Sequence, residues 1–270
     1  MTRNLSYTHH LSLKLGVVIS FFLLCVLLVG HGEYAFADSH SYDHGSRHRV
    51  VTVIDGDTVH LEEEGSLRLT GIQAPELQPL SEPFAIEAKE LLEELILGRE
   101  VILLSFGADR DRYGRLLAHL ERDDGLWVQG ALLTAGLVRV YTFPDNRARA
   151  AEMLALEQEA RLHLRGLWQH PDYAIRQPEQ TYDDIDTFQI VEGTVYQATK
   201  VRSRIYVNFD RDWRTDFTIR IERPALQLFS EADMDPLDLQ GKHVRVRGWI
   251  RLLNGPEIEV SHPEQIEILP

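Results

Sequence analysis

Three short motifs, each placed where an apolar run gives way to a turn, constrain this chain more than any other feature. They occupy residues 53–59 (VIDGDTV), 68–76 (RLTGIQAPE) and 111–115 (DRYGR). Glycine between two aspartates, proline before glutamate and glycine before arginine all favour sharp changes of chain direction. The motifs therefore predict short strands joined by tight turns, with charged side chains at the strand ends.

The runs around these motifs predict a mixed α+β domain over residues 50–169. Strands are predicted at 50–53, 58–61, 67–69, 101–104 and 116–120. Helices are predicted at 83–97, 128–135 and 148–164, each followed within two residues by a glycine that can end it. We expect Leu167 and Trp168, just after the last helix, to fold back onto the core.

A second domain is predicted over residues 188–270. Residues 170–187 contain two prolines and a run of acidic residues, which predicts a linker. Beyond it apolar and polar residues alternate, as in half-buried antiparallel strands. The alternation predicts strands at 205–209, 217–221, 244–248, 258–260 and 266–268, with a short helix near 226–232. Five strands and one helix predict a second small barrel of the oligonucleotide/oligosaccharide-binding kind.

The N-terminus predicts export. Arg3 and Lys14 precede an apolar run at 15–30, and Ala35-Phe36-Ala37 provides a small-residue cleavage site, so residues 1–37 are typical of a signal peptide. The alternative is an uncleaved membrane anchor, although the run is shorter than the roughly 20 residues of a comfortable span. We expect a bacterial periplasmic or extracellular protein. The His- and Ser-rich residues 38–49 predict a flexible linker.

The net charge of −14 is unusual for a protein that handles a polyanion. It does not exclude such a partner, because local patches set the field in a cleft.

In this order and spacing the three motifs resemble those of the staphylococcal nuclease, or thermonuclease, family, and the resemblance extends from about Val50 to Trp168. It implies a five-stranded barrel with three helices, calcium dependence and hydrolysis of DNA or RNA phosphodiester bonds. It also implies that a glutamate and two arginines are catalytic. Glu76 corresponds to the glutamate, Arg68 and Arg115 correspond to the arginines, and Asp57 corresponds to a carboxylate ligand of the metal.

These residue types suit phosphodiester hydrolysis on chemical grounds. A carboxylate can accept the proton of the attacking water, which contributes roughly 10²–10⁴-fold to the rate. Guanidinium groups present rigid paired donors to phosphate oxygens and stabilise the charge of the transition state. Taken singly, Arg68 or Arg115 would more often be an ordinary surface ion-pair residue. The joint pattern favours catalysis.

The chain departs from the family at Gln73, where the resemblance implies a second metal-binding aspartate. An amide oxygen can ligate calcium, but the site loses a negative charge on which calcium affinity depends. Asp55 can compensate, and the backbone carbonyl of Ala74 can serve as a further ligand. Three alternatives stay open: a weakened calcium site, a changed metal preference, or a catalytically weak or inactive protein that only binds nucleic acid.

The resemblance also implies substrate-binding residues. Arg112 and Tyr113 correspond to a pair near the terminal phosphate of a bound nucleotide. Tyr141 corresponds to a base-stacking tyrosine, with an ordinary rim aromatic as the alternative.

The C-terminal segment predicts either a groove for single strands or a solvated charged face. The residues concerned are Arg202, Arg204, Arg211, Arg214, Arg245, Arg247 and Arg251, with Tyr206, Trp213 and Trp249 nearby. The expected partner is a nucleic-acid substrate. Association with a membrane is expected only if the N-terminal segment is not cleaved, and no obligate protein partner is inferred. An envelope scaffold that binds no nucleic acid is the remaining class.

Overall fold

The computed structural model describes residues 45–270. The predicted signal peptide at 1–37, its apolar run at 15–30 and most of the predicted linker at 38–49 lie outside the described residues. Within the described residues, every helix is too short or too polar to traverse a bilayer.

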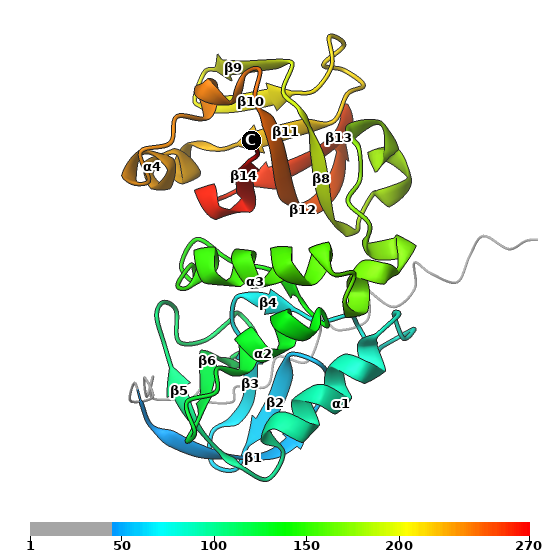
Figure 1. Ribbon diagram of the computed structural model, residues 1–270. Coiled ribbons are helices and arrows are strands. Elements are labelled where there is room, and N and C mark those ends of the chain that lie inside the picture. The colour runs from blue at the N-terminus through cyan, green and yellow to red at the C-terminus, as the bar shows by residue number, and fades with distance from the viewer. Residues whose placement is uncertain (1–44) are drawn as a thin grey trace, which may run out of the picture. The chain divides into compact units, whose positions relative to one another are not determined.

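Five strands of the first half close into a barrel in the order β1-β2-β3-β6-β5. These strands are β1 (Arg47–Val53), β2 (Thr58–Leu61), β3 (Gly65–Leu69), β5 (Glu100–Leu104) and β6 (Leu116–Arg122), seen in the lower part of Figure 1. Neighbours are antiparallel except β3 and β6, which run parallel. The predicted α+β fold with a five-stranded barrel is confirmed.

Three helices stand close to where the sequence predicts them. They are α1 (Ala85–Ile96), α2 (Val128–Ala135) and α3 (Ala150–Leu162). Buried residues of α1 and α2 belong to the same apolar core as the interior of the barrel. Leu167 and Trp168 are buried, but in a separate apolar cluster with Tyr173 and Ile190 and not, as predicted, in the core of the barrel.

The second half forms a barrel-like sheet with the same strand order as the first. Its seven strands are β8 (Phe188–Thr194), β9 (Gln197–Val201), β10 (Arg204–Asn208), β11 (Thr218–Ile221), β12 (His243–Leu253), β13 (Gly255–Val260) and β14 (Ile266–Ile268). The order β9-β10-β11-β13-β12-β8 contains one parallel pair, β11 with β13, as the first barrel does. Because only Val195 and Tyr196 separate β8 from β9, the ring closes through the chain itself. Helix α4 (Arg223–Glu231) follows the third strand of the ring, as α1 does in the first barrel.

The structure corrects several predicted elements. The five predicted C-terminal strands are present, but β8 and β9 were not predicted. Strand β1 begins at Arg47 rather than at residue 50, because Arg47–Arg49 pair with β5. Two-residue strands β4 (Ile72–Gln73) and β7 (Arg139–Val140) are too short to show a period. The predicted linker at 170–187 contains short 3-10 turns at Pro171–Tyr173 and Pro178–Asp184.

A buried ion cluster joins α3 to β12. Glu157 is fully buried and accepts hydrogen bonds from Arg161 Nη1 at 2.9 Å and from Arg247 Nη1 at 3.1 Å. Its Oε1 also accepts the Val140 backbone N–H at 2.8 Å. Burial alone would raise the pKa of Glu157, but Arg247 and Arg161 hold it below its usual value.

Replacing Glu157 with Gln is expected to lower the free energy of unfolding at pH 7 by up to about 3–5 kcal/mol, because the buried Arg161 and Arg247 keep only the carboxylate of Glu267 between them. The folded pKa of Glu157 lies below the unfolded value of about 4.3, so its contribution is present above that pH and is lost as the pH falls through the folded pKa. Urea denaturation should therefore show the full difference at pH 7 and a smaller one below about pH 4.

The matched control is Glu159→Gln, which removes an exposed carboxylate from the same helix. A similar loss of stability in both variants, or none in Glu157→Gln, would contradict the stabilising role of the cluster.

Candidate active site

The turn at Asp55-Gly56-Asp57 connects β1 to β2 and packs closely against its neighbours. A Cβ on Gly56 would stand 2.6 Å from the Cβ of Ala74 and 2.7 Å from that of Ala88, so only glycine fits here. The Asp57 N–H donates to Asp55 Oδ1 at 3.0 Å and closes the turn. The close packing fixes Asp57 against the segment that contains Ala74.

The buried carboxylate of Asp57 is the centre of a compact set of contacts. Its Oδ2 accepts the Ala74 backbone N–H at 2.7 Å, and its Oδ1 accepts the Thr58 hydroxyl at 3.1 Å. The same Oδ1 forms an ion pair with Arg68 Nη1. The predicted metal ligand and the first predicted catalytic arginine therefore contact each other.

Arg68 extends from β3 into this set. Its Nη2 donates to the Ile72 carbonyl at 3.2 Å, and its Nη1 donates to the Asp57 carbonyl at 3.3 Å. Burial lowers the pKa of Arg68 to about 10, which leaves the guanidinium charged at neutral pH. The negative charges of Asp55 and Glu76 raise the pKa of Arg68, and the positive charge of Arg115 lowers it.

Gln73, the last residue of β4, and Glu76, three residues further on, lie side by side. Gln73 is buried, and its Nε2 donates to Glu76 Oε1 at 3.5 Å. Burial raises the pKa of Glu76 above its usual value; Asp55 adds to the increase and Arg68 opposes it. The pKa of Asp55 is also raised, chiefly by burial, against the opposing charge of Arg68. A carboxylate with raised pKa is a stronger proton acceptor, which suits a general base.

The third motif folds into a turn that positions Arg115. Its Nε donates to Asp111 Oδ2 at 2.7 Å, and the backbone N–H groups of Tyr113 and Arg115 donate to Asp111 Oδ1. Gly114 has φ +80°, the left-handed conformation that favours glycine. The guanidinium groups of Arg112 and Arg115 lie 4.8 and 5.7 Å from the ring centre of Tyr113, whose ring is mostly exposed.

Tyr141 belongs to an aromatic cluster that draws on both barrels. Its ring contacts Phe143 and Phe188 edge-on, with centroid distances of 4.7 and 5.1 Å. Trp249 Nε1 donates to its hydroxyl at 3.3 Å. We call Tyr141, Phe143, Phe188 and Trp249 the aromatic cluster. The Tyr141 backbone N–H donates to the Gly71 carbonyl at 2.9 Å, next to Ile72, whose carbonyl accepts from Arg68.

A cleft of about 380 Å³ lies beside Glu76. Residues of the first barrel, including Gln73, Glu76 and Arg139, form part of its lining, and residues of the second barrel, including Phe188, Gln189 and Trp249, form another part. This size is within the range of roughly 300–1,000 Å³ typical of ligand pockets.

The motif analysis missed Arg139, Glu82 and Phe188. Arg139 faces Gln73 across the β4–β7 pair, and its Nη1 donates to the Phe188 carbonyl at 2.9 Å. Glu82 Oε2 accepts the backbone N–H of Glu76 at 2.9 Å. These residues stand outside the three motifs, so only the tertiary contacts identify them.

The oxygen atoms near Asp57 are of the type that binds a hard cation. Asp55 and Asp57 supply carboxylates, Gln73 supplies an amide oxygen, and calcium prefers such ligands. Within residues 45–270, however, no three His, Cys, Asp or Glu side chains are grouped tightly enough to hold a metal. The amide at Gln73 and the ion pair of Asp57 with Arg68 account for the shortage of free carboxylate oxygens.

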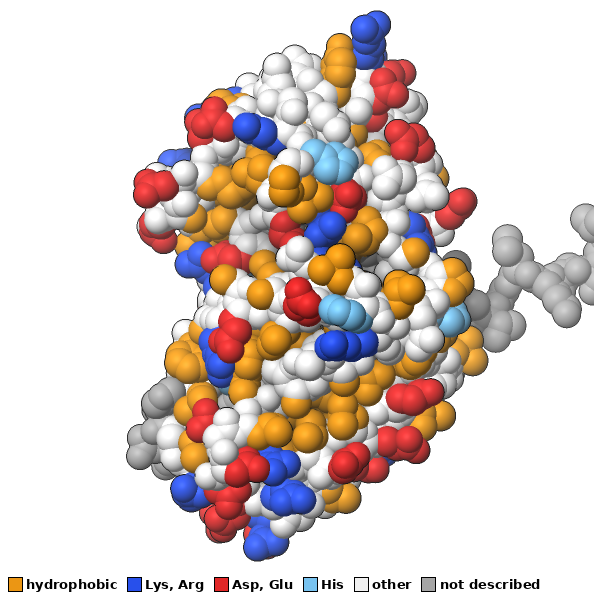
Figure 2. All heavy atoms as spheres, viewed as in Figure 1, with side chains coloured by type: hydrophobic (Ala, Val, Ile, Leu, Met, Phe, Trp, Pro, Cys, Tyr) orange, Lys and Arg blue, Asp and Glu red, His pale blue; other side chains and the backbone are white. Residues whose placement is uncertain are grey.

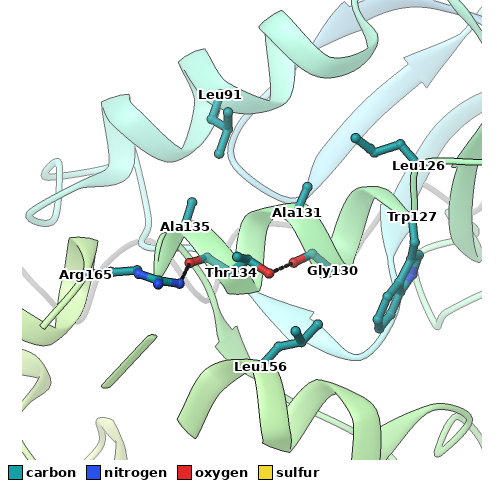
Figure 3. A pocket seen from close by; sticks show the side chains of 9 residues that line it. All are labelled: Leu91, Leu126, Trp127, Gly130, Ala131, Thr134, Ala135, Leu156 and Arg165. Carbon is teal, nitrogen blue, oxygen red and sulfur yellow. Dashed lines mark hydrogen bonds between the residues drawn. The ribbon is translucent and has the colours of Figure 1, made fainter. Parts of the chain in front are cut away.

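A second hollow offers no hydrolytic chemistry. Apolar side chains of α1, α2 and α3 line it, as Figure 3 shows, and such side chains gather over α1 and α2 on the face drawn in Figure 2. Its one charged lining residue, Arg165, donates from Nη1 to the Thr134 carbonyl at 3.1 Å.

The predicted basic groove of the C-terminal segment is largely absent among the described residues, because carboxylates neutralise most of its arginines. Arg204 pairs with Glu222 at 2.9 Å, Arg245 with Glu192 at 2.7 Å and Arg251 with Asp186 at 2.7 Å. Arg247 is buried in the cluster with Glu157. Trp249, by contrast, lies in the cleft beside Glu76.

Comparison with known proteins agrees with the barrel and its motifs. The family described as staphylococcal nuclease homologue matches residues 66–170. An uncharacterised endonuclease of Escherichia coli O157:H7 is 32% identical over 127 residues, which cover 46% of this chain and 78% of that protein. Protein ParB of Escherichia coli is 35% identical over 136 residues, with 46% and 73% covered. A thermonuclease of Staphylococcus intermedius is 26% identical over 162 residues, with 57% and 96% covered.

The matched range begins within β3 and contains β4 and the DRYGR turn, and the Asp55-Gly56-Asp57 turn lies before it. The barrel of this chain, its three motifs and these similarities agree, and the chain therefore belongs to the staphylococcal nuclease homologue family.

Proposed function

We propose that this protein is a metal-dependent nuclease that hydrolyses phosphodiester bonds of DNA or RNA. Membership in the family supports a nuclease, as do similar proteins that are named endonuclease and thermonuclease. The observation that carries the proposal is the set of contacts in which Asp57 pairs with Arg68 and holds Ala74, two residues before Glu76.

Glu76 is the proposed general base. Its carboxylate lines the cleft, and its pKa is raised by burial, so it accepts a proton more readily than an ordinary surface glutamate. The Gln73 amide and the Glu82 carboxylate, which contact its side chain and its backbone, orient it. Glu76 takes the proton of the water that attacks the phosphorus, the bond from phosphorus to the leaving sugar oxygen breaks, and that oxygen takes a proton from solvent.

Arg68 and Arg115 are the proposed phosphate ligands. Each guanidinium presents paired donors to the non-bridging oxygens and opposes the negative charge that grows on them in the transition state. Arg68 already has a carboxylate partner in Asp57, and we propose that the substrate phosphate replaces this partner. Arg112 and Tyr113, exposed in the same turn, are the proposed contacts to a further phosphate.

Calcium is the proposed cation, with Asp57, Asp55, Gln73 and the carbonyl of Ala74 as its ligands. When bound, it would polarise a phosphoryl oxygen and help to neutralise the phosphate. Export to the periplasm or medium is also proposed, and it rests on residues 1–37 alone.

Glu76→Gln is expected to reduce the rate of hydrolysis by roughly 10²–10⁴-fold, because the amide cannot accept the proton. Purified residues 38–270 are incubated with plasmid and with RNA in calcium, magnesium or chelator, and initial rates are compared. The unfolding midpoint of the variant should match that of the wild type, since the shape of the side chain is kept.

Glu87→Gln is the control, because it removes an exposed carboxylate from the first turn of α1. Equal rates of hydrolysis by wild type and Glu76→Gln would rule out Glu76 as the general base. Nucleic-acid binding without hydrolysis by the wild type would instead support the alternative that Gln73 motivates, a protein that only binds.

Gln73→Asp is expected to tighten calcium binding, because it restores a negative charge next to Asp57. Isothermal titration of calcium into each protein measures the change. Gln197→Asp adds the same charge at an exposed position of β9 and serves as the control. Equal calcium affinity in Gln73→Asp and wild type would show that Gln73 is not a calcium ligand.

A further inference from the structure

We propose that the second barrel completes the substrate cleft and that the cleft binds an unpaired nucleobase next to the bond that is cut. The proposal rests on the proposed nuclease function and names the substrate class of that site, a single strand. Its starting observation is that Glu76, the proposed base, and Trp249, from β12, line the same cleft of about 380 Å³.

Trp249 and Phe188 lie beyond residues 66–170, the range that matches the family. They therefore add to the site something that the family motifs do not contain. Their attachment to the first barrel is specific: Trp249 Nε1 donates to the Tyr141 hydroxyl at 3.3 Å, and Phe188 presents its carbonyl to Arg139.

The aromatic cluster provides a surface on which a base can stack. Phe188 is buried, and Trp249 is 39% exposed, so Trp249 offers part of its ring to a ligand while Phe188 supports it at a centroid distance of 6.5 Å. Stacking on an aromatic side chain is worth roughly 1–3 kcal/mol per base and tolerates any sequence. A base paired in a duplex cannot enter, because its complement would have to enter with it.

The carboxylates of the cleft suit a base. Five carboxylates line it, from Glu76, Glu82, Asp172, Asp184 and Asp186, but Arg176 pairs with Asp184 and Arg251 pairs with Asp186. Glu76, Glu82 and Asp172 have no arginine partner within residues 45–270, so their oxygens can accept hydrogen bonds from the amino groups of a base.

Arg139 fits the same role. It is 8% exposed and stands within 5.1 Å of the Tyr173 ring centre and 4.8 Å of that of Phe188. Within residues 45–270 no carboxylate pairs with it, and its one hydrogen bond goes to the Phe188 carbonyl. Its remaining N–H groups can donate to the ring nitrogens or carbonyls of a base.

The test combines Trp249→Ala with abasic substrates. A single-stranded oligonucleotide carries one abasic residue, which is moved position by position past a mapped cleavage site. Cleavage by the full chain is measured as kcat/KM. Binding is measured separately by the anisotropy of a labelled oligonucleotide under chelator.

Trp249→Ala is expected to lower kcat/KM on the intact strand by about 5- to 150-fold, the loss of one stacked base. One abasic position beside the cut bond should cause a similar loss in the wild type and no further loss in the variant. Trp249→Phe should retain most of the activity. Tyr196→Ala, which removes an exposed aromatic of the second barrel outside the cleft, should not change it.

An unchanged kcat/KM in Trp249→Ala would overturn the proposal. So would a loss of kcat/KM in Trp249→Ala, relative to the wild type, that is equal on the intact strand and on every abasic strand. If the wild type cleaves no substrate, the proposed function fails, but the anisotropy still decides the cleft. The proposal is supported if Trp249→Ala binds the intact strand more weakly than the wild type does and if this difference disappears when one position is abasic. Equal binding by the two proteins rejects it.

Discussion

The buried carboxylate of Asp57 fixes the geometry on which the rest of the site depends. Through Ala74, Thr58 and Arg68 it ties the turn after β1 to β3 and to the segment that carries Gln73 and Glu76. Gly56 makes this contact possible, because any side chain there would collide with Ala74 and Ala88. The residues that can bind a cation and a phosphate are therefore brought together by one ion pair, which the substrate must rearrange.

The second barrel acts on this site through two junctions. The cluster of Glu157, Arg161 and Arg247 fixes β12 against α3, and paired buried charges of this kind tolerate little displacement. Trp249, two residues after Arg247, thereby reaches Tyr141 at the edge of the first barrel. Carboxylates pair with most of the arginines in the C-terminal half, and its Phe188 and Trp249 form part of the wall of the cleft that contains Glu76.

Local pattern was enough for most of the strands and helices, whereas the roles of the motif residues come from the family resemblance and stay predictions. The strands around Asp57 and Arg68 and the helix that contains Ala88 follow from alternation, glycine and proline, which act within a few residues. Pattern could not predict the contact of Trp249 with Tyr141 or the placement of Arg139 opposite Gln73, because these depend on how distant segments pack. It also could not show that the C-terminal arginines are neutralised, since the position of an arginine in the sequence does not indicate which carboxylate it will contact.

The proposed mechanism requires a substrate phosphate to bind between Arg68 and Arg115 beside Glu76. A crystal structure of the Glu76→Gln chain with a short single-stranded oligonucleotide tests this binding mode. We expect a phosphate held by both guanidinium groups, with Arg68 released from Asp57 and the flanking base against Trp249. A phosphate bound elsewhere, with Arg68 still paired to Asp57, would contradict it.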